Sequence, residues 1–353
     1  MRIDEKLVQY EAALILRNTL GIGAKKIAKI LNTLGFYVSE NIVHGWIYSQ
    51  KIPTRKVSPL LKSLFYRDAY KLALKIKKEN PNWGPTRIKT RLKRLIGIWI
   101  PEMTIYYWVR KKAKPNIMFI RFSPELGYII GTCLSDAKRT TEVSLKVRDK
   151  DYVTEYALSL TKLTGKKYEV KENNGWYEVR VNGSALRYMV KTGLWKVVAY
   201  VYTREFLQGL FDGDGYINVS AKNSFKVVVG YTSSNIELLN FCSQLLKQKY
   251  GIKVLKRTQF EENDLVKIKG RKYRVKRTEL IIIYRLNDLK TFSDQIGFKI
   301  KRKKEKLADA LNILSNYRGK ERIRKWKEMY EKINGKWIKR ASPTSASIQY
   351  SYK

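Results

Sequence analysis

The sequence predicts an α+β fold with pseudo-twofold symmetry, preceded by an all-α region. Residues 1–114 are helical in pattern and contain an internal repeat. After them, the order helix, hairpin, helix, hairpin, helix occurs twice, and each copy opens on an apolar helix that ends in an acidic residue. We therefore divide the chain into an N-terminal region (1–114), a first half (115–202), a second half (203–318) and a basic helical extension with a flexible tail (319–353).

The charge of the chain predicts a polyanionic partner. Its 353 residues include 72 Lys plus Arg against 31 Asp plus Glu, a formal net charge of +41. The 24 tyrosines and 8 tryptophans favour ordered aromatic surfaces over a protein that only coats nucleic acid. The sequence shows no signal peptide and no apolar run long enough to span a membrane, so we expect no membrane partner.

Cysteine and histidine usage restricts the possible chemistry. Cys133 and Cys242 both fall in apolar helical patterns, so we predict buried thiols in a reducing compartment that contains DNA, such as the cytoplasm with its nucleoid. The single histidine, His44, excludes mechanisms that need two or more histidines, including the zinc hydrolases. Chemistry would therefore depend on carboxylates, lysines and a metal ion.

The N-terminal repeat has a helix-turn-helix pattern. Residues 23–47 align with residues 84–109 at an offset of 61, and of 62 after one inserted residue. Each copy consists of a basic amphipathic helix, a turn at a glycine, and a second helix that begins near Ser39 or Pro101. Trp46 and its counterpart in the second copy are predicted core residues.

The second helix of a helix-turn-helix unit lies in the major groove, with its early side chains toward the base edges. Generic three-helix packing explains the apolar spacing equally well, but the duplication and the surrounding charge favour DNA binding. The candidate base-contacting residues are Ser39, Glu40, Asn41 and His44 in the first copy, and Glu102, Met103, Thr104, Tyr106 and Tyr107 in the second.

Two apolar helices organise the rest of the chain. The first, SPELGYIIGTCLSDA at residues 123–137, has Ser123 as its expected cap and ends at Asp136. The second, TREFLQGLFDGDG at residues 203–215, has Thr203 as its expected cap and ends at two acids. Small residues recur every four positions on both helices, which predicts that the two backbones pack closely with their acids at the same end.

This pair resembles the twin helices of the LAGLIDADG homing endonucleases. The second copy, LQGLFDGDG at residues 207–215, matches the motif closely. The first, IIGTCLSDA at residues 129–137, keeps the acid but has Ala137 in place of the last glycine. The resemblance implies a single-chain, two-motif fold whose motif helices form the interface between the halves, with a sheet from each half facing DNA. It also implies hydrolysis of one phosphodiester per strand.

The acids that end the two helices are the candidate metal ligands. Two carboxylates at helix C-terminal ends need a cation between them, and Mg²⁺ or Mn²⁺ suits oxygen ligands. We expect Asp136 and Asp214 to hold the metal with the carbonyls of Ser135 and Gly213, whereas Asp212 is expected to be a helix-end or turn residue.

The resemblance also implies a catalytic lysine just before the closing helix of each half. The best match is Lys301 in the second half, with Lys196 as the candidate in the first. A contact with the DNA backbone is the alternative role for both lysines.

Polar residues on the predicted strands are expected to face DNA. Only five residues separate Asp136 from the strand at Glu142, so the first hairpin is expected to be short. The second half instead carries a basic insertion at residues 263–277. The candidate DNA-contacting residues are Lys146 and Arg148 in the first half, and Tyr216, Asn218, Ser220, Lys226 and Arg257 in the second.

The leading functional hypothesis is a sequence-specific, metal-dependent double-strand DNA endonuclease of the kind borne by introns and other mobile elements. It would act as a monomer, because one chain contains both halves, and would cut the two strands unequally. The alternative is a catalytically weakened relative that acts as a transcription regulator or an intron RNA maturase. Ala137 and the helix-turn-helix units favour that alternative, and retention of both acids speaks against it. A transposase or recombinase accessory protein is a third possibility, because paired helix-turn-helix units recur in such enzymes.

Overall fold

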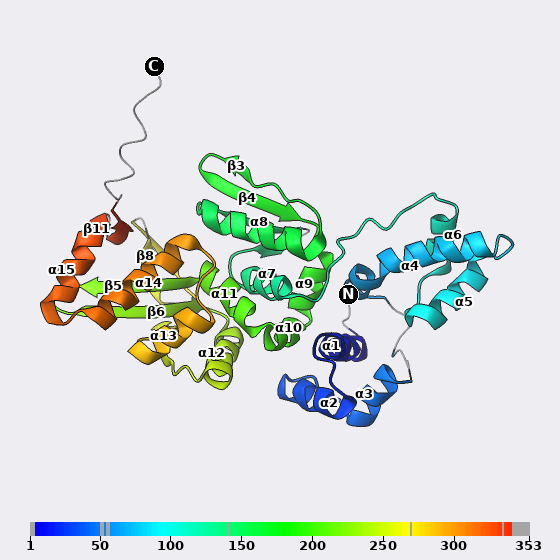
Figure 1. Ribbon diagram of the computed structural model, residues 1–353, viewed down its shortest axis with the longest axis horizontal. Coiled ribbons are helices and arrows are strands. Elements are labelled where there is room, and N and C mark those ends of the chain that lie inside the picture. Colours follow the sequence, from blue (N-terminus) through cyan, green and yellow to red (C-terminus); the bar gives the residue numbers. More distant parts are fainter. Residues whose placement is uncertain are drawn as a thin grey trace, which may run out of the picture. The chain divides into compact units, whose positions relative to one another are not determined.

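The computed structural model describes residues 4–49, 53, 57–139, 142–268, 270–333 and 335–340. The chain forms two compact units, unit 1 (Met1–Gly209) and unit 2 (Leu210–Lys353), and each contains a four-stranded antiparallel sheet (Figure 1). The mixed helix and sheet composition agrees with the predicted α+β class. No helix in the described ranges is long and apolar enough to cross a membrane.

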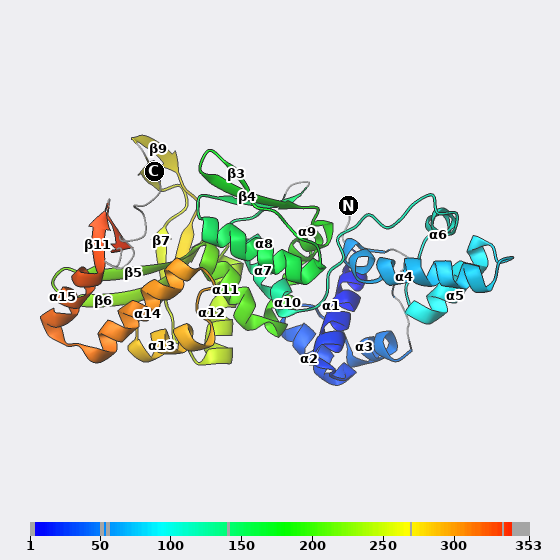
Figure 2. The same cartoon turned by 45° about the horizontal axis from the view of Figure 1, so that its top comes forward.

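Unit 1 opens with two three-helix groups, so the N-terminal repeat contains one helix more per copy than the sequence pattern indicates (Figure 2). The first group comprises α1 (Glu5–Leu20), α2 (Ala24–Thr33) and α3 (Glu40–Ile47). The second comprises α4 (Pro59–Glu79), α5 (Pro85–Ile96) and α6 (Glu102–Val109).

The two groups share an aromatic pair at their cores. Tyr10 of α1 meets Trp46 edge to face with ring centroids 5.9 Å apart, and Tyr66 of α4 meets Trp108 in the same way at 5.3 Å. Both tryptophans are buried, as the sequence predicts. Because the same pair recurs, α1 and α4 are equivalent helices of one duplicated unit.

The first half follows within unit 1. Its sheet has the order β1-β2-β4-β3, and α8 packs on β2 and β4. The expected tight turn is present, with positive φ at Asn174 and Gly175, and the short first hairpin is present as β1 paired with β2. The elements are α7 (Pro124–Leu134), β1 (Lys138–Arg139), β2 (Val143–Val147), α8 (Lys150–Thr164), β3 (Lys171–Asn173), β4 (Trp176–Val181), α9 (Ser184–Lys191) and α10 (Trp195–Val201).

The helical groups are not isolated within unit 1. Helix α1 packs on α10, and α4 packs on α9. Each three-helix group therefore rests on a helix of the first half, although the sequence places a basic connector at residues 111–122 between the two regions.

Unit 2 contains a longer sheet with the order β5-β6-β10-β7, and α12 and α14 pack on it. The basic insertion forms a separate hairpin, β8 with β9 (Figure 2). The elements are α11 (Thr203–Gly213, which begins in unit 1), β5 (Gly215–Ala221), β6 (Phe225–Ser233), α12 (Ile236–Tyr250), β7 (Leu255–Phe260), β8 (Leu265–Ile268), β9 (Arg271–Arg274), β10 (Thr278–Ile283), α13 (Leu286–Gln295) and α14 (Lys301–Asn316).

The C-terminal extension corrects one prediction. Residues 319–340 are not helical throughout: α15 (Gly319–Met329) gives way to a hairpin of β11 (Tyr330–Ile333) and β12 (Lys336–Lys339). The physical reason is aromatic burial, because Trp326 is fully buried against Phe225 and stacks on Tyr330 with ring centroids 4.0 Å apart. The extension is thus part of the core of unit 2, and the predicted tail at 341–353 lies outside the described residues.

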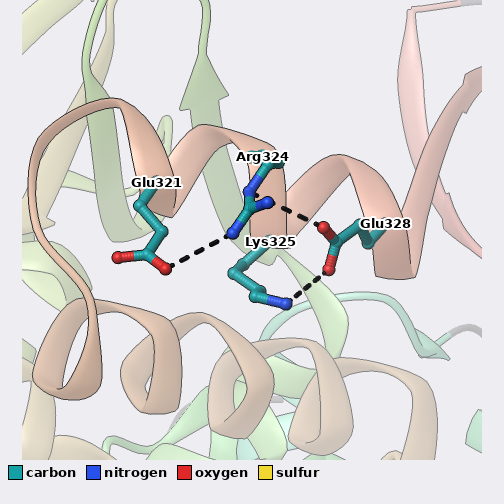
Figure 3. Close-up of polar contacts among 4 residues, drawn as sticks. All are labelled: Glu321, Arg324, Lys325 and Glu328. Carbon is teal, nitrogen blue, oxygen red and sulfur yellow. Dashed lines mark hydrogen bonds and ion pairs between the residues drawn. The ribbon is translucent and has the colours of Figure 1, made fainter.

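The solvent side of α15 carries a local network of ion pairs (Figure 3). Arg324 lies 3.5 Å from Glu321 and 3.8 Å from Glu328, and Lys325 lies 2.8 Å from Glu328. Ion pairs at this helical spacing on an exposed face contribute little to stability. The charges on this face are largely balanced, in contrast to the net charge of the chain.

Candidate functional site

The backbones of the motif helices α7 and α11 are in close contact within unit 1. A Cβ placed on Gly209 would lie 2.2 Å from the Tyr128 carbonyl oxygen of α7. A Cβ placed on Gly127 would lie 2.7 Å from the Cβ of Tyr202. No side chain fits at either glycine, so the small-residue stripes do produce the close packing that the sequence predicts.

The expected N-caps of these helices differ from the prediction. Ser123 makes no side-chain capping hydrogen bond. Thr203 is already the first helical residue, and its Oγ1 donates to the carbonyl oxygen of Tyr200 at 3.0 Å. The reason is the short connection, because α10 ends at Val201 and leaves only Tyr202 before α11.

The two motif helices end differently. Helix α11 continues to Gly213, and the exposed Asp214 follows at once, whereas α7 stops at Leu134, two residues before the exposed Asp136. A Cβ at Gly215 would lie 2.4 Å from the Phe211 carbonyl oxygen, so this turn admits only glycine. The equivalent Ala137 carries a Cβ and is buried, which explains why the first turn has another shape.

Asp212 has a structural role, as the sequence predicts. It is 2% exposed, and its carboxylate accepts the backbone N–H groups of Lys299 at 3.2 Å and Ile300 at 3.4 Å. Ile300 is the residue that precedes α14. The carboxylate therefore satisfies free N–H groups at the positive end of that helix.

The lysine beside the second motif is Lys303, which the sequence prediction missed. Its Nζ donates to the carbonyl oxygens of Phe211 at 2.9 Å, Asp212 at 2.6 Å, Gly215 at 2.7 Å and Gly213 at 3.4 Å. These carbonyls lie at the C-terminal end of α11, where a cation is favoured. The Gly213 carbonyl, a predicted metal ligand, thus already accepts a hydrogen bond.

The two lysines predicted to be catalytic lie at the start of α14 and in α10. The side chain of Lys301 is 82% exposed, and its Nζ is 3.8 Å from Glu305. Lys196 lies in α10 with its Nζ 5.8 Å from the ring centroid of Trp195. Five residues after Lys301, Lys306 donates to the carbonyl oxygen of Ile217 at 3.3 Å, and burial lowers its pKa, with Arg302 as the smaller cause.

The sheet of unit 2 brings the five predicted DNA-contacting residues to one face. Alternate residues Ile217, Val219 and Ala221 of β5 are buried on the other face, toward α14 and α15. Strand pairing sets Ser220 opposite Lys226 and connects Arg257 through Leu280 to Thr232 of β6. The shared face carries Tyr216, Asn218, Ser220, Lys226 and Arg257.

The sheet of unit 1 likewise exposes Lys146 and Arg148, and adds a residue that the prediction missed. The Arg148 guanidinium lies 5.0 Å from the ring centroid of Trp176, whose side chain is 38% exposed. Trp176 directly follows the Asn174-Gly175 turn, so a half-exposed tryptophan at a hairpin turn is the signal that could have identified it. On the same strand, Arg180 is paired with Glu178 at 2.8 Å.

The helix-turn-helix candidates fall into two groups. In the first copy, Ser39 caps α3 by accepting the Ile42 N–H at 3.4 Å, while Glu40, Asn41 and His44 are exposed. In the second copy, Met103 and Tyr107 are exposed, whereas Thr104 and Tyr106 are half-buried.

Glu102, a predicted base-contacting residue, also makes contacts within its own three-helix group. Its carboxylate accepts hydrogen bonds from Thr86 at 2.7 Å and Lys89 at 2.8 Å, both on α5. These contacts lower its pKa and brace α6 against α5. The ion pair with Lys89 gives the Glu102 carboxylate a role in packing α6 against α5.

Comparison with known proteins agrees with this architecture. The LAGLIDADG-like domain family matches residues 202–297. A protein of Methanocaldococcus jannaschii described as uncharacterised is 30% identical over 264 residues, which cover 69% of this chain and 92% of that protein. The chain belongs to the LAGLIDADG family.

Other relatives of this LAGLIDADG protein are more distant. The DNA-directed RNA polymerase subunit Rpo1C of M. jannaschii is 27% identical over 229 residues, 59% of this chain but 24% of that subunit. A structure of I-DmoI in complex with DNA and Ca is 14% identical with a TM-score of 0.39, covering 53% of this chain and 98% of that one. Full-length DUF199/WhiA from Thermatoga maritima is 14% identical with a TM-score of 0.37, covering 60% and 68%. Both TM-scores are below 0.5, so the family assignment does not rest on these structures.

Each motif ends in a donor that suits a hard cation. Asp136 and Asp214 offer exposed carboxylate oxygens, the ligand type that Mg²⁺ and Mn²⁺ prefer. Cys133 and Cys242 are both buried, as predicted, and form no disulfide. Burial also raises the pKa of the Cys242 thiol, so it is inert at neutral pH.

Proposed function

We propose that this LAGLIDADG protein is a site-specific, metal-dependent double-strand DNA endonuclease of homing type. The observation that supports the proposal is the difference in environment between the two acids of LQGLFDGDG at residues 207–215. Asp212 is buried and caps another helix, whereas Asp214 is exposed directly after α11. Lys303 already supplies a positive charge to the α11 carbonyls, and the Asp214 carboxylate beside them stays exposed to solvent, which favours a role in binding rather than packing.

In this proposal each half contributes one acid, Asp136 or Asp214, and each acid serves the cleavage of one strand. A bound Mg²⁺ or Mn²⁺ would neutralise developing charge on the phosphate oxygens and activate water. Lys303 has a positioning role, because it fixes the carbonyls around Asp214. The exposed sheet faces bind the duplex, and α3 and α6 contact base edges in its major groove. The protein acts as a monomer.

The test is selection of cleaved sites from a randomised duplex library, with and without Mg²⁺ or Mn²⁺. We expect metal-dependent cleavage of one extended site, and loss of cleavage with retained binding for Asp214→Asn. Asp68→Asn removes an equally charged, 72% exposed side chain of α4 and should cleave normally. A protein that binds one site tightly but cuts it with neither metal contradicts the proposal.

A second candidate is a non-cleaving DNA-binding regulator or intron RNA maturase of the same fold. The early end of α7 before Ala137 favours it, because the first motif no longer has the turn of the second. Under the endonuclease proposal this difference predicts unequal nicking of the two strands. Regulation or splicing activity that survives Asp136→Ala and Asp214→Asn together would favour the second candidate.

A further inference from the structure

A pocket of about 460 Å³ opens between the end of α4 and the outer face of α5. Small-molecule and nucleotide sites in proteins commonly measure about 300–1,000 Å³. None of the predicted base-contacting residues lines it. Its lining consists of Ile76 and Trp83 together with the polar residues Glu79, Asn80, Arg87, Thr90, Arg91 and Arg94.

Three arginines give the pocket a positive charge. Arg87, Arg91 and Arg94 are spaced by four and then three residues, so they share one face of α5 with neighbouring Cβ atoms about 5–6 Å apart. In the part of the chain that the structure describes, no ion pair or side-chain hydrogen bond engages any of the three guanidinium groups. The one acid of the pocket, Glu79, lies 3.8 Å from Lys75 of its own helix. Unengaged guanidinium groups in a row suit phosphate oxygens.

The arginines are separated from the basic residues that serve α6. Lys89 and Lys93 lie on another face of α5, with their Nζ atoms 5.4 and 5.0 Å from the ring centroid of Trp99. Lys89 also holds Glu102. The fold of the second three-helix group therefore uses the lysines of α5 and leaves its arginines for another purpose.

Trp83 forms an aromatic wall that is held in place. Lys77 donates to the carbonyl oxygens of Pro81 at 2.6 Å and Trp83 at 3.0 Å, which fixes the loop between α4 and α5. The Trp83 side chain is half-buried and packs against the core of the group. A fixed aromatic ring beside a row of cations is the arrangement on which nucleic-acid bases stack.

The N-terminal repeat provides an internal comparison. The first three-helix group has the same fold, and the offset of 61 residues identifies its equivalent positions. Where the second copy has the tryptophan and the three arginines, the first has Ile22, Lys26, Ile30 and Thr33. Because the fold forms without these side chains, packing alone does not explain them.

We propose that this pocket binds the backbone phosphates of one nucleic-acid strand, with Trp83 stacked on an unpaired base. Arg87 and Arg94 are seven positions apart, about 10 Å along α5. Successive phosphates of a strand advance about 3.4 Å along a duplex axis, so the row is long enough to contact more than one backbone phosphate. The site is independent of metal and cleavage, and it takes a single strand where the proposed endonuclease takes a duplex.

The test measures binding of a labelled single-stranded oligonucleotide by fluorescence anisotropy, with the full chain in EDTA at several salt concentrations. We expect Arg91→Gln with Arg94→Gln to weaken binding about tenfold and to lower the salt slope by about 1.4, since each phosphate contact contributes about 0.7. The matched control is Lys25→Gln with Lys29→Gln, which removes two exposed charges from the equivalent helix α2 and should have a smaller effect.

The stacking part of the proposal has its own readout. Trp83→Leu keeps an apolar side chain against the core, and thermal melting confirms that the variant folds. It should weaken binding of the normal strand about tenfold and leave binding of an abasic strand unchanged. Equal losses for both strands, or equal losses for the α2 and α5 double variants, overturn the proposal.

Two competition arms separate the possible sources of phosphate. If pyrophosphate or ATP displaces the strand at comparable concentration, the pocket is a free-nucleotide site and the strand assignment is wrong. If the α5 double variant weakens duplex binding as much as single-strand binding, the arginines are ordinary duplex contacts and the proposal is again wrong. Selective loss of single-strand binding, without competition by nucleotides, supports it.

Discussion

The Nζ atom of Lys303 lies 2.6 Å from the backbone carbonyl oxygen of Asp212, and the Asp212 carboxylate accepts the N–H groups that precede α14. Helices α11 and α14 thus cap each other. The acid of α11 lies at the positive end of α14, and the lysine of α14 lies at the negative end of α11. This reciprocal contact fixes the backbone from which Asp214 projects.

Removal of the lysine should loosen the end of α11. We expect Lys303→Met to lower the free energy of unfolding by about 2 kcal/mol, the size of a hydrogen bond to a charged group. Urea unfolding measures the loss. Lys301→Met, at the 82% exposed neighbour, should change stability by less than about 0.5 kcal/mol. Equal effects of the two variants would show that the contacts of Lys303 with the α11 carbonyls contribute little.

Substitutions of the two acids of the second motif should affect different properties, stability for Asp212 and cleavage for Asp214. Asp212→Ala leaves buried N–H groups without an acceptor, so we expect a loss of about 2 kcal/mol in unfolding free energy. Asp214→Asn, at an exposed position, should leave stability within about 0.5 kcal/mol and remove cleavage. Chemical denaturation combined with a plasmid cleavage assay tests both. Cleavage by a folded Asp214→Asn protein would remove the basis of the proposed function.

The packing of α7 on α11 should tolerate no side chain at Gly209. A methyl group there would lie 2.2 Å from the Tyr128 carbonyl oxygen, so the helices must separate. We expect Gly209→Ala to cost about 1–3 kcal/mol, as overpacking does. The control is Gly84→Ala, where the added Cβ has no neighbour within 4 Å and the cost should stay below about 1 kcal/mol. Thermal melts of the two variants decide between a packing effect and a general effect of adding a methyl group.

The sequence predicts the order of elements well because periodicity and turn residues are local properties. The Asn174-Gly175 turn correctly placed the hairpin of β3 and β4, and the alternation of β5 set Tyr216, Asn218 and Ser220 on one face of the second sheet. The sequence could not identify Lys303 as the lysine beside α11, because four consecutive basic residues occur at 301–304. Which of the four side chains points toward α11 depends on the residue at which α14 begins. The C-terminal hairpin was missed because burial of Trp326 against Phe225 is a contact between distant segments.

The buried acid of α1 joins three helices of unit 1. Glu11 is 1% exposed and accepts hydrogen bonds from Ser58, which caps α4, and from Tyr188 of α9 at 2.8 Å. Burial is the largest effect and raises the pKa of Glu11 from 4.5 to about 7, with a smaller contribution from Asp4, while the two hydrogen bonds lower it. The sequence pattern gave no sign of this site, since Glu11 lies among apolar residues of an ordinary helix.

The raised pKa makes the stability of unit 1 depend on pH. Because the folded pKa of Glu11 exceeds its unfolded value, the folded chain binds more protons between about pH 4.5 and pH 7, and stability is lost as pH rises through that window. The loss can reach about 3 kcal/mol. The chain has a single histidine, so few other groups change charge above pH 5.5. Melting temperatures between pH 5.5 and pH 8 should therefore fall for the wild-type chain.

Substitution of the acid should remove this dependence. Glu11→Gln keeps the size and hydrogen-bonding capacity of the side chain but cannot ionise, so its melting temperature should vary little over the same pH range. Glu40→Gln, at an exposed position of α3, should follow the wild-type profile. A wild-type profile as flat as that of Glu11→Gln would mean that Glu11 is charged in the folded chain throughout, held by Ser58 and Tyr188 despite its burial.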